Sequence, residues 1–310
     1  MKIGRMATVA GAHVCAIDGD RVVDLALAAC AAGREWMAPL FHDLRLFLAA
    51  GDMARDAAAS LAASGPAVPL ESVRLLAPIE AGSKILAHVV NYFDHGAEGK
   101  LTPPEQPFFF TKLPGTVVAP GDPIGGHDFS RKMDYEAELA VVIGREGRDI
   151  AEEDAYDHVA GYTVCNDVSY RELQANEAAP TLTGRYGQNW LQGKSLDRSC
   201  PLGPAIALAR DIPRPYPLRI LCRVNGEIRQ DASTEQMIFK IPALVAHISR
   251  AMTLRPGDVI ATGTPAGCGV ADGRYLRPGD VVECEIERVG SLRNTVLAAR
   301  VAAPAAARRG

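Results

Sequence analysis

One segment, Asp134 to Gly144, constrains the fold of this chain more than any other. Its second half, Leu139 to Ile143, is apolar at every position, which is typical of a strand buried on both faces. Its first half carries Asp134, Glu136 and Glu138 at alternate positions, so an extended backbone points all three carboxylates to one side. Carboxylates beside a core are costly unless they are protonated, paired or bound to metal. Since the neighbouring sequence holds too few cations to pair them, the segment predicts an exposed acidic strand start or a site for a hard divalent cation.

A further carboxylate, Asp167, follows a short strand expected at 161–166 and opens a helix expected over 168–174. On that helix Asp167, Arg171 and Gln174 fall at positions that share one face. Taken alone, Asp167 is equally well explained as an N-cap with Arg171 as its partner. Combined with the acidic strand, it predicts a three-carboxylate site of the kind that suits Mg²⁺, which keeps positions open for water or substrate.

Two other features carry polar groups that suit catalysis. His95 and Glu98 are three residues apart, so on one helical turn the carboxylate orients the imidazole and raises its basicity. Without further context such a pair is more often an ordinary surface pair. The glycine-rich segment 263–269 lacks the lysine of a P-loop and the glycine spacing of a dinucleotide fold, which excludes nucleotide binding. Its backbone N–H groups and Thr264 can instead hold a substrate carboxylate.

Composition excludes several classes of protein. The chain has 310 residues and a net charge of −4, with no basic cluster, so we expect no nucleic-acid partner and no anionic membrane surface. Seven scattered cysteines without a Cys-x-x-Cys pair indicate reduced core residues. No apolar run reaches the ~18 residues of a spanning helix, and the N-terminus lacks the apolar block of a signal peptide. These features predict a soluble, cytoplasmic protein.

The pattern of expected secondary structure changes near residue 75. We expect residues 1–75 to form a small α+β domain, with strands at 8–10, 14–17 and 22–25 and helices over 26–51 and 53–63. Residues 76–303 have strands joined by Pro-Gly-Asp turns, the clearest at 218–224, 258–261 and 281–288, and form the predicted catalytic domain. The Ala- and Arg-rich tail, 304–310, is predicted to be disordered.

Several ordered segments resemble one enzyme family. The chain is similar to the fumarylacetoacetate hydrolase family from about residue 78 to residue 301, and the number and order of the matching segments make chance agreement very improbable. These segments are Asn91–Glu98, Asp134–Leu139, Asn166–Arg171, Gly193–Asp197, Pro201–Pro204, Val224–Glu227 and Gly263–Pro265. The resemblance implies a mixed α/β, β-rich fold like the C-terminal domain of that family, behind a small N-terminal domain.

The resemblance also assigns roles to residues. It implies one Mg²⁺ or Mn²⁺ ion per site on Glu136, Glu138 and Asp167, and it implies a homodimer. His95 and Glu98 would activate water, while Arg171, Gln174 and Lys194 would stabilise an oxyanion, and Tyr92, Lys112, Gly263 and Thr264 would contact substrate. His88 departs from the family, whose members usually have a small or apolar residue there. A core or interface histidine and a substrate contact both remain open for His88.

These features predict a metal-dependent hydrolase that cleaves a C–C bond in a 2,4-dioxo acid of the acylpyruvate type. The ion would chelate the oxo-acid end of the substrate, and hydroxide formed at His95 would attack the C4 carbonyl. The same electron sink serves two alternatives, which are decarboxylation of a β-oxo acid such as oxaloacetate and tautomerisation or isomerisation of a hydroxy-dienoate. A non-catalytic oxo-acid-binding scaffold is an alternative of a different class.

Overall fold

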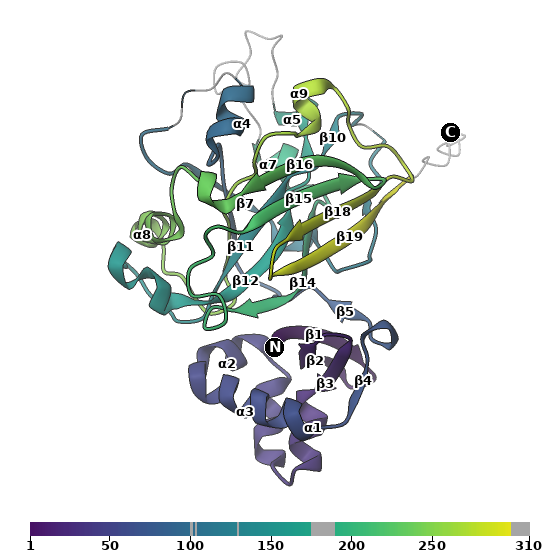
Figure 1. Cartoon of the computed structure of the whole chain (residues 1–310), viewed down its shortest axis with the longest axis vertical. Coiled ribbons are helices and arrows are strands. Elements are labelled where there is room, and N and C mark those ends of the chain that lie inside the picture. Colours follow the sequence, from purple (N-terminus) through teal and green to yellow (C-terminus); the bar gives the residue numbers. More distant parts are fainter. Residues whose placement is uncertain (100–101, 103, 129, 175–189, 299–310) are drawn as a thin grey trace, which may run out of the picture.

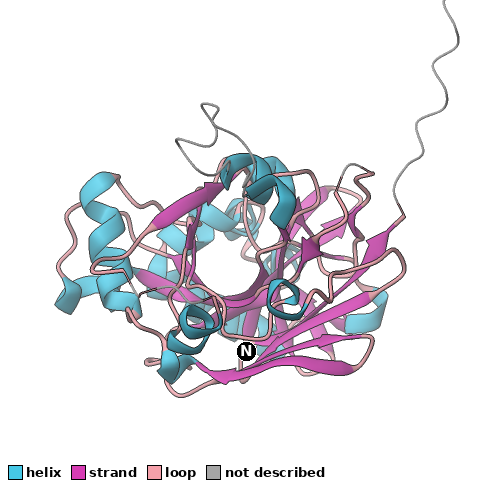
Figure 2. Ribbon diagram, turned by 90° about the horizontal axis from the view of Figure 1, so that it is seen from above, coloured by secondary structure: helices cyan, strands magenta, loops and turns pink. Residues whose placement is uncertain are grey.

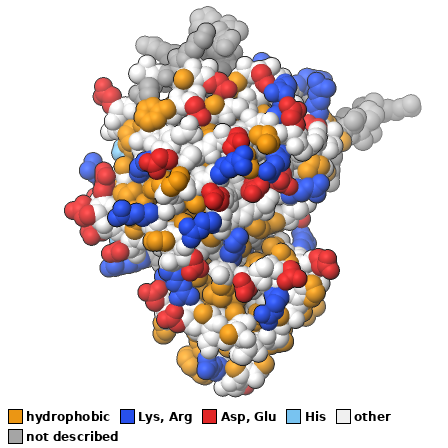
Figure 3. Space-filling model, viewed as in Figure 1, with side chains coloured by type: hydrophobic (Ala, Val, Ile, Leu, Met, Phe, Trp, Pro, Cys, Tyr) orange, Lys and Arg blue, Asp and Glu red, His pale blue; other side chains and the backbone are white. Residues whose placement is uncertain are grey.

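A computed structural model of the chain describes residues 1–99, 102, 104–128, 130–174 and 190–298 (Figure 1). The predicted tail, 304–310, lies outside the described residues. None of the described helices is long and apolar enough to cross a bilayer. On the face shown in Figure 3, acidic and basic side chains are intermixed rather than gathered into one patch.

The N-terminal unit, residues 1–75, combines antiparallel strands with helices. The region predicted as one helix over 26–51 is divided into three, and the strand predicted at 8–10 is the turn between two longer strands. The elements are β1 (Lys2–Thr8), β2 (Gly11–Asp18), β3 (Arg21–Asp24), α1 (Leu25–Ala31), η1 (Glu35–Phe41), α2 (Leu44–Ala49), α3 (Gly51–Ser64), β4 (Ala67–Pro69), η2 (Leu70–Ser72) and β5 (Leu75–Leu76).

The rest of the chain is rich in β-structure, and Figure 2 shows its strands surrounding the middle of the molecule. Its strands are β6 (Ile85–His88), β7 (Phe109–Lys112), β8 (Val117–Val118), β9 (Ile124–Gly125), β10 (Met133–Asp134), β11 (Ala137–Ile143), β12 (Val159–Asn166), β13 (Ser169–Tyr170), β14 (Cys200–Leu208), β15 (Arg219–Val224), β16 (Glu227–Ser233), β17 (Val259–Ala261), β18 (Val281–Ile286) and β19 (Gly290–Leu297). Its helices are α4 (Phe93–Glu98), η3 (Pro114–Thr116), η4 (Glu152–His158), α5 (Arg171–Gln174), α7 (Trp190–Lys194), η5 (Thr234–Gln236), α8 (Ile241–Ala251) and α9 (Gly269–Asp272).

A 12-stranded sheet runs through both parts in the order β4-β3-β2-β1-β14-β12-β11-β17-β6-β7, with β5 and β8 paired at its side. The N-terminal unit joins it where Lys2 and Ile3 pair with β14. Residues of this unit also share one apolar core with β6, β11 and β17. A separate 5-stranded sheet has the order β16-β15-β18-β19-β9. The division into two domains therefore stays a prediction, since sheet and core are continuous across residue 75.

The buried strand predicted from the sequence is confirmed, although it begins at Ala137 rather than Asp134. Every residue of β11 is buried. Leu139, Val141 and Ile143 pack into one core on one face, and Ala140 and Val142 pack into the other. This alternation explains why the segment is apolar throughout, because neither face of the strand meets water.

The helix predicted to follow Asp167 begins later than expected. Ser169 and Tyr170 form β13, which pairs with β10, and helix α5 begins only at Arg171. The backbone N–H of Arg171 donates to the carbonyl of Lys132, which extends this pairing. Strand pairing with a distant segment thus replaces the first helical turn, and Asp167 does not share a helix face with Arg171 and Gln174.

Candidate active site and metal centre

Three acidic side chains meet where β11 begins and β12 ends. Glu138 is paired in register with Cys165, and the N–H of Asp167 donates to the carbonyl of Glu136 over 2.9 Å. This pairing brings ligand atoms of Glu136, Glu138 and Asp167 within 4.8 Å of one another. The three side chains are at most 4 % exposed. The cluster that the sequence analysis predicted from two separate segments therefore exists as one buried group.

Asp134 does not belong to this cluster. Its carboxylate accepts hydrogen bonds from the N–H groups of Gly269 and Val270, over 2.7 and 3.0 Å, and from Nε of Arg171. The alternation of Asp134, Glu136 and Glu138 predicted that all three would point together. The backbone of Asp134 instead belongs to β10, ahead of the break that precedes β11, and this break redirects its side chain.

The sequence next to β11 supplies none of the cations that pair with the ligands Glu136 and Asp167, but distant segments do. Nζ of Lys194 lies 2.6 Å from Glu136 and 2.7 Å from Asp167, and Nζ of Lys112 lies 2.7 Å from Asp167. Arg171 contacts Glu136 over 2.6 Å. The cations come from β7, α5 and α7, which are remote in sequence from β11, so inspection of its neighbours could not find them.

The electrostatics of the cluster differ from one carboxylate to the next. Burial opposes the charge of Glu136, but the neighbouring Lys194 and Arg171 lower its pKa below the ordinary range. Burial and the charges of Asp167 and Glu136 raise the pKa of Glu138 well above its usual value. Oε1 of Glu138 is also buried without a hydrogen-bond partner among the described residues. An unpartnered carboxylate oxygen beside two other carboxylates fits a hard divalent cation, and all three side chains offer the oxygen ligands that Mg²⁺ and Mn²⁺ prefer.

His95 and Glu98 lie on α4, one turn apart, as expected. Nδ1 of His95 is 3.7 Å from Oε2 of Glu98, too far for a hydrogen bond, and it is buried without a partner in the described structure. Both carboxylate oxygens of Glu98 accept from the N–H of Gly267 over 3.2 Å. Glu98 therefore ties α4 to the glycine-rich loop and holds its charge close to the imidazole.

A cavity of about 540 Å³ lies over the acidic cluster. It brings together His95, Arg171, Gln174, Lys194 and Thr264 with two of the acidic ligands. Its lining residues are His88, Val89, Val90, His95, Gly99, Phe108, Phe110, Glu136, Glu138, Arg171, Gln174, Trp190, Lys194, Thr264 and Val270. The volume lies in the range typical of small-molecule sites, and the polar groups converge on one part of the wall.

Five predicted site residues do not line this cavity, and Glu98 and the ligand Asp167 are two of them. Tyr92 and Lys112 are fully buried, and Nζ of Lys112 donates to Asp167 and to the carbonyl of Val168. The N–H of Gly263 donates to Glu138 over 2.8 Å. Since the N–H groups of Gly263, Gly267 and Gly269 already have carboxylate partners in the protein, they do not face a ligand as the sequence analysis expected.

Sequence reasoning missed Gln230. Its amide Nε2 donates to Oγ1 of Thr264 and to the carbonyl of Pro265, both over 2.9 Å, while its Oε1 accepts from the N–H of Ala137. It therefore connects the glycine-rich loop to the start of β11. A glutamine within an ordinary strand sequence carries no pattern that distinguishes it.

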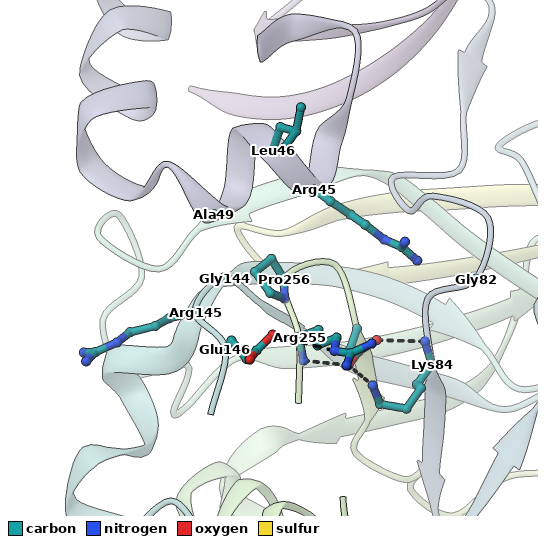
Figure 4. Close-up of a pocket in the computed structure, with 11 residues that line it drawn as sticks. Arg45, Leu46, Ala49, Gly82, Lys84, Gly144, Arg145, Glu146, Arg255 and Pro256 are labelled. Carbon is teal, nitrogen blue, oxygen red and sulfur yellow. Dashed lines mark hydrogen bonds and ion pairs between the residues drawn. The ribbon is translucent and has the colours of Figure 1, made fainter. Parts of the chain in front are cut away.

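A second cavity of about 480 Å³ lies between α2 and the main sheet (Figure 4). Arg45 reaches from α2 towards the Gly82 segment, whereas Arg145 points away from the cavity. Lys84 pairs with Asp258, and Arg255 lies 3.6 Å from Glu146. Most of the charged side chains around this second cavity are exposed or already paired. Its described lining therefore lacks the converging unpartnered polar groups found in the cavity over the acidic cluster.

Comparison with known proteins agrees with this geometry. The family model described as fumarylacetoacetate (FAA) hydrolase C-terminal matches residues 84–297. The chain belongs to the fumarylacetoacetate hydrolase family. The family match includes every predicted site residue and ends before the C-terminal tail. The mixed α/β, β-rich fold expected from the sequence is thereby confirmed.

Relatives within the fumarylacetoacetate hydrolase family are named for different activities. The mitochondrial oxaloacetate tautomerase of Xenopus laevis is 44% identical over 257 residues, covering 82% of this chain and 78% of that protein. The fumarylacetoacetate hydrolase of Exiguobacterium antarcticum has a similar structure, with a TM-score of 0.78 and 34% identity, covering 96% of this chain and 99% of that one. The maleylpyruvate hydrolase of Sphingobium, solved with manganese and pyruvate, has a TM-score of 0.77 and 29% identity, covering 97% and 100%.

Proposed function

We propose that this chain is a metal-dependent tautomerase that interconverts the keto and enol forms of a small 2-oxo acid. The observation that carries the proposal is the cluster of Glu136, Glu138 and Asp167 beside a cavity that also exposes Arg171 and Lys194. The oxaloacetate tautomerase relative, at 44% identity, supports tautomerisation ahead of the C–C hydrolysis expected from the sequence. Tautomerisation of a hydroxy-dienoate was among the alternatives that share this metal site.

Glu136, Glu138 and Asp167 would hold Mg²⁺ or Mn²⁺, whose positive charge stabilises an enolate oxygen when the ion is bound. Burial opposes the charge of Lys194, but Asp167 and Glu136 raise its pKa above the ordinary value. Lys194 therefore stays protonated and acts as a fixed hydrogen-bond donor rather than a base. Arg171, also a permanent cation, holds the substrate carboxylate or the developing oxyanion in the same way.

The remaining requirement is a proton carrier. Conversion of enol to ketone removes one proton from the oxygen on C2 and adds one to C3, so the composition of the substrate does not change. His95 lines the cavity, and its buried Nδ1 lacks a partner. We assign the proton transfer at C3 to His95, with Glu98 nearby to stabilise the imidazolium. Lys112 holds Asp167 in position from behind.

The test is the decay of enol absorbance after a 2-oxo acid, prepared as its enol, is mixed with the metal-loaded enzyme. We expect acceleration over the buffer rate that disappears on chelation and returns when Mg²⁺ or Mn²⁺ is added. The matched control is Glu146→Gln, which removes an exposed carboxylate outside the cavity. An enzyme that leaves enol decay at the buffer rate with every 2-oxo acid would exclude tautomerisation.

Hydrolysis is the second candidate, because the His95 and Glu98 pair suits water activation and a structural neighbour is named maleylpyruvate hydrolase. Its test is the conversion of acylpyruvates to pyruvate in ¹⁸O-labelled water. Label in the released acid would establish hydrolysis, whereas enol decay without acid release would favour the tautomerase. The homodimer and the cytoplasmic location remain predictions.

A further inference from the structure

The cavity over the acidic cluster is lined by two unlike sets of residues, one charged and one apolar. Its charged side contains Glu136, Glu138, Arg171 and Lys194. Its apolar lining residues, which we call the apolar wall, are Val89, Val90, Phe108, Phe110, Trp190 and Val270. A substrate whose oxo-acid end reaches the charged side can place its other end against this wall.

The apolar wall begins directly beside the charged side. The rings of Phe110, on β7, and Trp190, on α7, have centroids 5.4 Å apart. Nζ of Lys194, which bonds two of the acidic ligands, lies 5.2 Å from the centroid of Phe110 and 6.0 Å from that of Trp190. The two rings therefore stand next to Lys194. Under the proposed function, the substituent of a 2-oxo acid would begin beside them.

The charges around the cluster suit a substrate with a single carboxylate. Four carboxylates gather here, Asp134 and the three ligands. Three of them, all but Glu138, are in contact with the cations Lys112, Arg171 and Lys194. One negative charge is left, which a divalent cation would convert to one positive charge. One substrate carboxylate neutralises it, and a second would leave a buried excess of negative charge.

The described lining has no lysine or arginine to spare for a second carboxylate, and its His95 is the group assigned to proton transfer. Arg171 and Lys194 are its only arginine and lysine, and both are already paired with protein carboxylates. His88 is held neutral, because burial and the neighbouring His247 lower its pKa to about 3. A carboxylate placed against the apolar wall would lose its hydration without gaining a partner.

We propose, on the basis of the tautomerase function, that the substrate is a 2-oxo acid with one carboxylate and an apolar, planar substituent that packs against Phe110 and Trp190. This assignment differs from oxaloacetate, which carries a second carboxylate in that position. Aromatic packing strengthens binding of such a substituent by about 2- to 10-fold beyond its apolar area.

The experiment compares two stable ligands that contain no enolisable carbon, so that binding is measured without turnover. Oxanilate carries a phenyl group on an oxamate core, and N-oxalylglycine carries a second carboxylate on the same core. Calorimetry on the Mg²⁺-loaded full chain should give at least about tenfold tighter binding for oxanilate. In a Trp36→Phe background, Trp190 is the single remaining tryptophan, and its emission should change with oxanilate.

Substitutions of Phe110 test whether the apolar wall causes the preference for oxanilate. Phe110→Ala should weaken oxanilate by about 10-fold and change N-oxalylglycine affinity by less than about twofold. Phe110→Leu keeps apolar volume without the ring, and it carries the test if the alanine variant does not fold. The matched control is Leu191→Ala, an exposed residue beside Trp190 on α7 that should change neither affinity.

Equal or tighter binding of N-oxalylglycine by the wild type would overturn the proposal, as would binding of neither ligand. Unchanged oxanilate affinity in both Phe110 variants would also overturn it. A clear preference for oxanilate without acceleration of enol decay would contradict the tautomerase function and leave the apolar specificity of the cavity intact.

Discussion

Two buried carboxylates, Asp24 in the N-terminal unit and Glu138 in the acidic cluster, illustrate two uses of a buried charge. Asp24 accepts from the N–H groups of Ala26 and Leu27, over 3.0 and 3.1 Å, and its other oxygen contacts Nδ1 of His13 over 2.7 Å. Glu138 has one hydrogen bond, from Gly263, and an oxygen without a partner in the described structure. The protein satisfies Asp24 completely, whereas Glu138 is left with capacity for a ligand.

Whether every oxygen of a buried carboxylate is hydrogen-bonded separates structural from functional carboxylates. A buried carboxylate whose oxygens are all bonded stabilises the local fold, here by capping α1. One held among like charges, with an oxygen left over, costs free energy until something binds. Substitution of Asp24 should therefore lower the stability of the protein, whereas substitution of Glu138 should weaken metal binding.

Glu138→Ala should have the largest effect on function. It removes one of three ligands, so we expect Mg²⁺ or Mn²⁺ affinity to fall by more than about 100-fold and turnover to be lost at ordinary metal concentrations. Because like charges repel in the metal-free cluster, stability without metal should be unchanged or higher. Calorimetric metal titration and urea unfolding in chelator measure both properties. A large loss of metal-free stability would place Glu138 in the same class as Asp24.

His95→Ala should come next, with the metal retained. If His95 carries the proton, kcat should fall by ~10²–10⁴-fold, the usual contribution of a general acid or base. Glu98→Gln should lose less, because the amide keeps a polar contact with the Gly267 loop but not the charge. Steady-state kinetics with an enol substrate test this, alongside metal titration of each variant. Normal kcat in His95→Ala would show that the proton moves through another group.

Asp24→Ala is the counterpart of the Glu138 variant. Loss of two N-terminal hydrogen bonds of α1 and of the His13 contact should lower the free energy of unfolding by about 2–4 kcal/mol. Metal affinity should not change, since Asp24 is not among the residues around the cavity. Urea unfolding with metal titration checks both expectations. Weaker metal binding in a folded Asp24→Ala protein would break the proposed separation.

Lys112→Met tests a residue that is hydrogen-bonded within the fold, like Asp24, and also serves the metal site, like Glu138. Lys112 is fully buried and satisfied, yet its partner is the ligand Asp167. Without this contact Asp167 is less firmly oriented, and we expect metal affinity to fall by about 10–100-fold. Lys84→Met is the control, because it removes a lysine paired with Asp258, away from the cavity. Equal metal affinity in the two variants would show that Lys112 does not position the ligand.

The sequence predicts the ligands better than their surroundings for a physical reason. Glu138 lies in a strand whose burial is visible in its composition, and Glu136 lies directly before that strand. Pairing of this segment with the one that ends at Asp167 follows from the order of elements. Which cations reach the cluster depends on the packing of β7, α5 and α7, and no local pattern encodes that packing. The helix predicted at 168–174 was wrong at its start for the same reason, because pairing with β10 is a long-range contact.

His88 resembles Glu138 in one respect. It is buried, and its Nε2 lacks a hydrogen-bond partner in the described structure, as does one oxygen of Glu138. Burial and His247 lower the pKa of His88 to about 3, below the ~6.5 of an unfolded chain. The unfolded state therefore binds a proton first, and stability present above pH 6.5 is lost as the pH falls towards 3. Between pH 7.5 and 5.5 this costs about 1.4 kcal/mol.

His88→Leu should remove that loss, so its free energy of unfolding should fall less than that of the wild type over the same interval. Urea unfolding in chelator at both pH values measures the difference, and the acidic cluster contributes equally to both proteins. If the variant also keeps its activity, an unpartnered atom at His88 reflects a cost of packing against Phe109, not a ligand contact. If activity is lost while the acid sensitivity persists, His88 belongs with Glu138 among the groups reserved for a ligand.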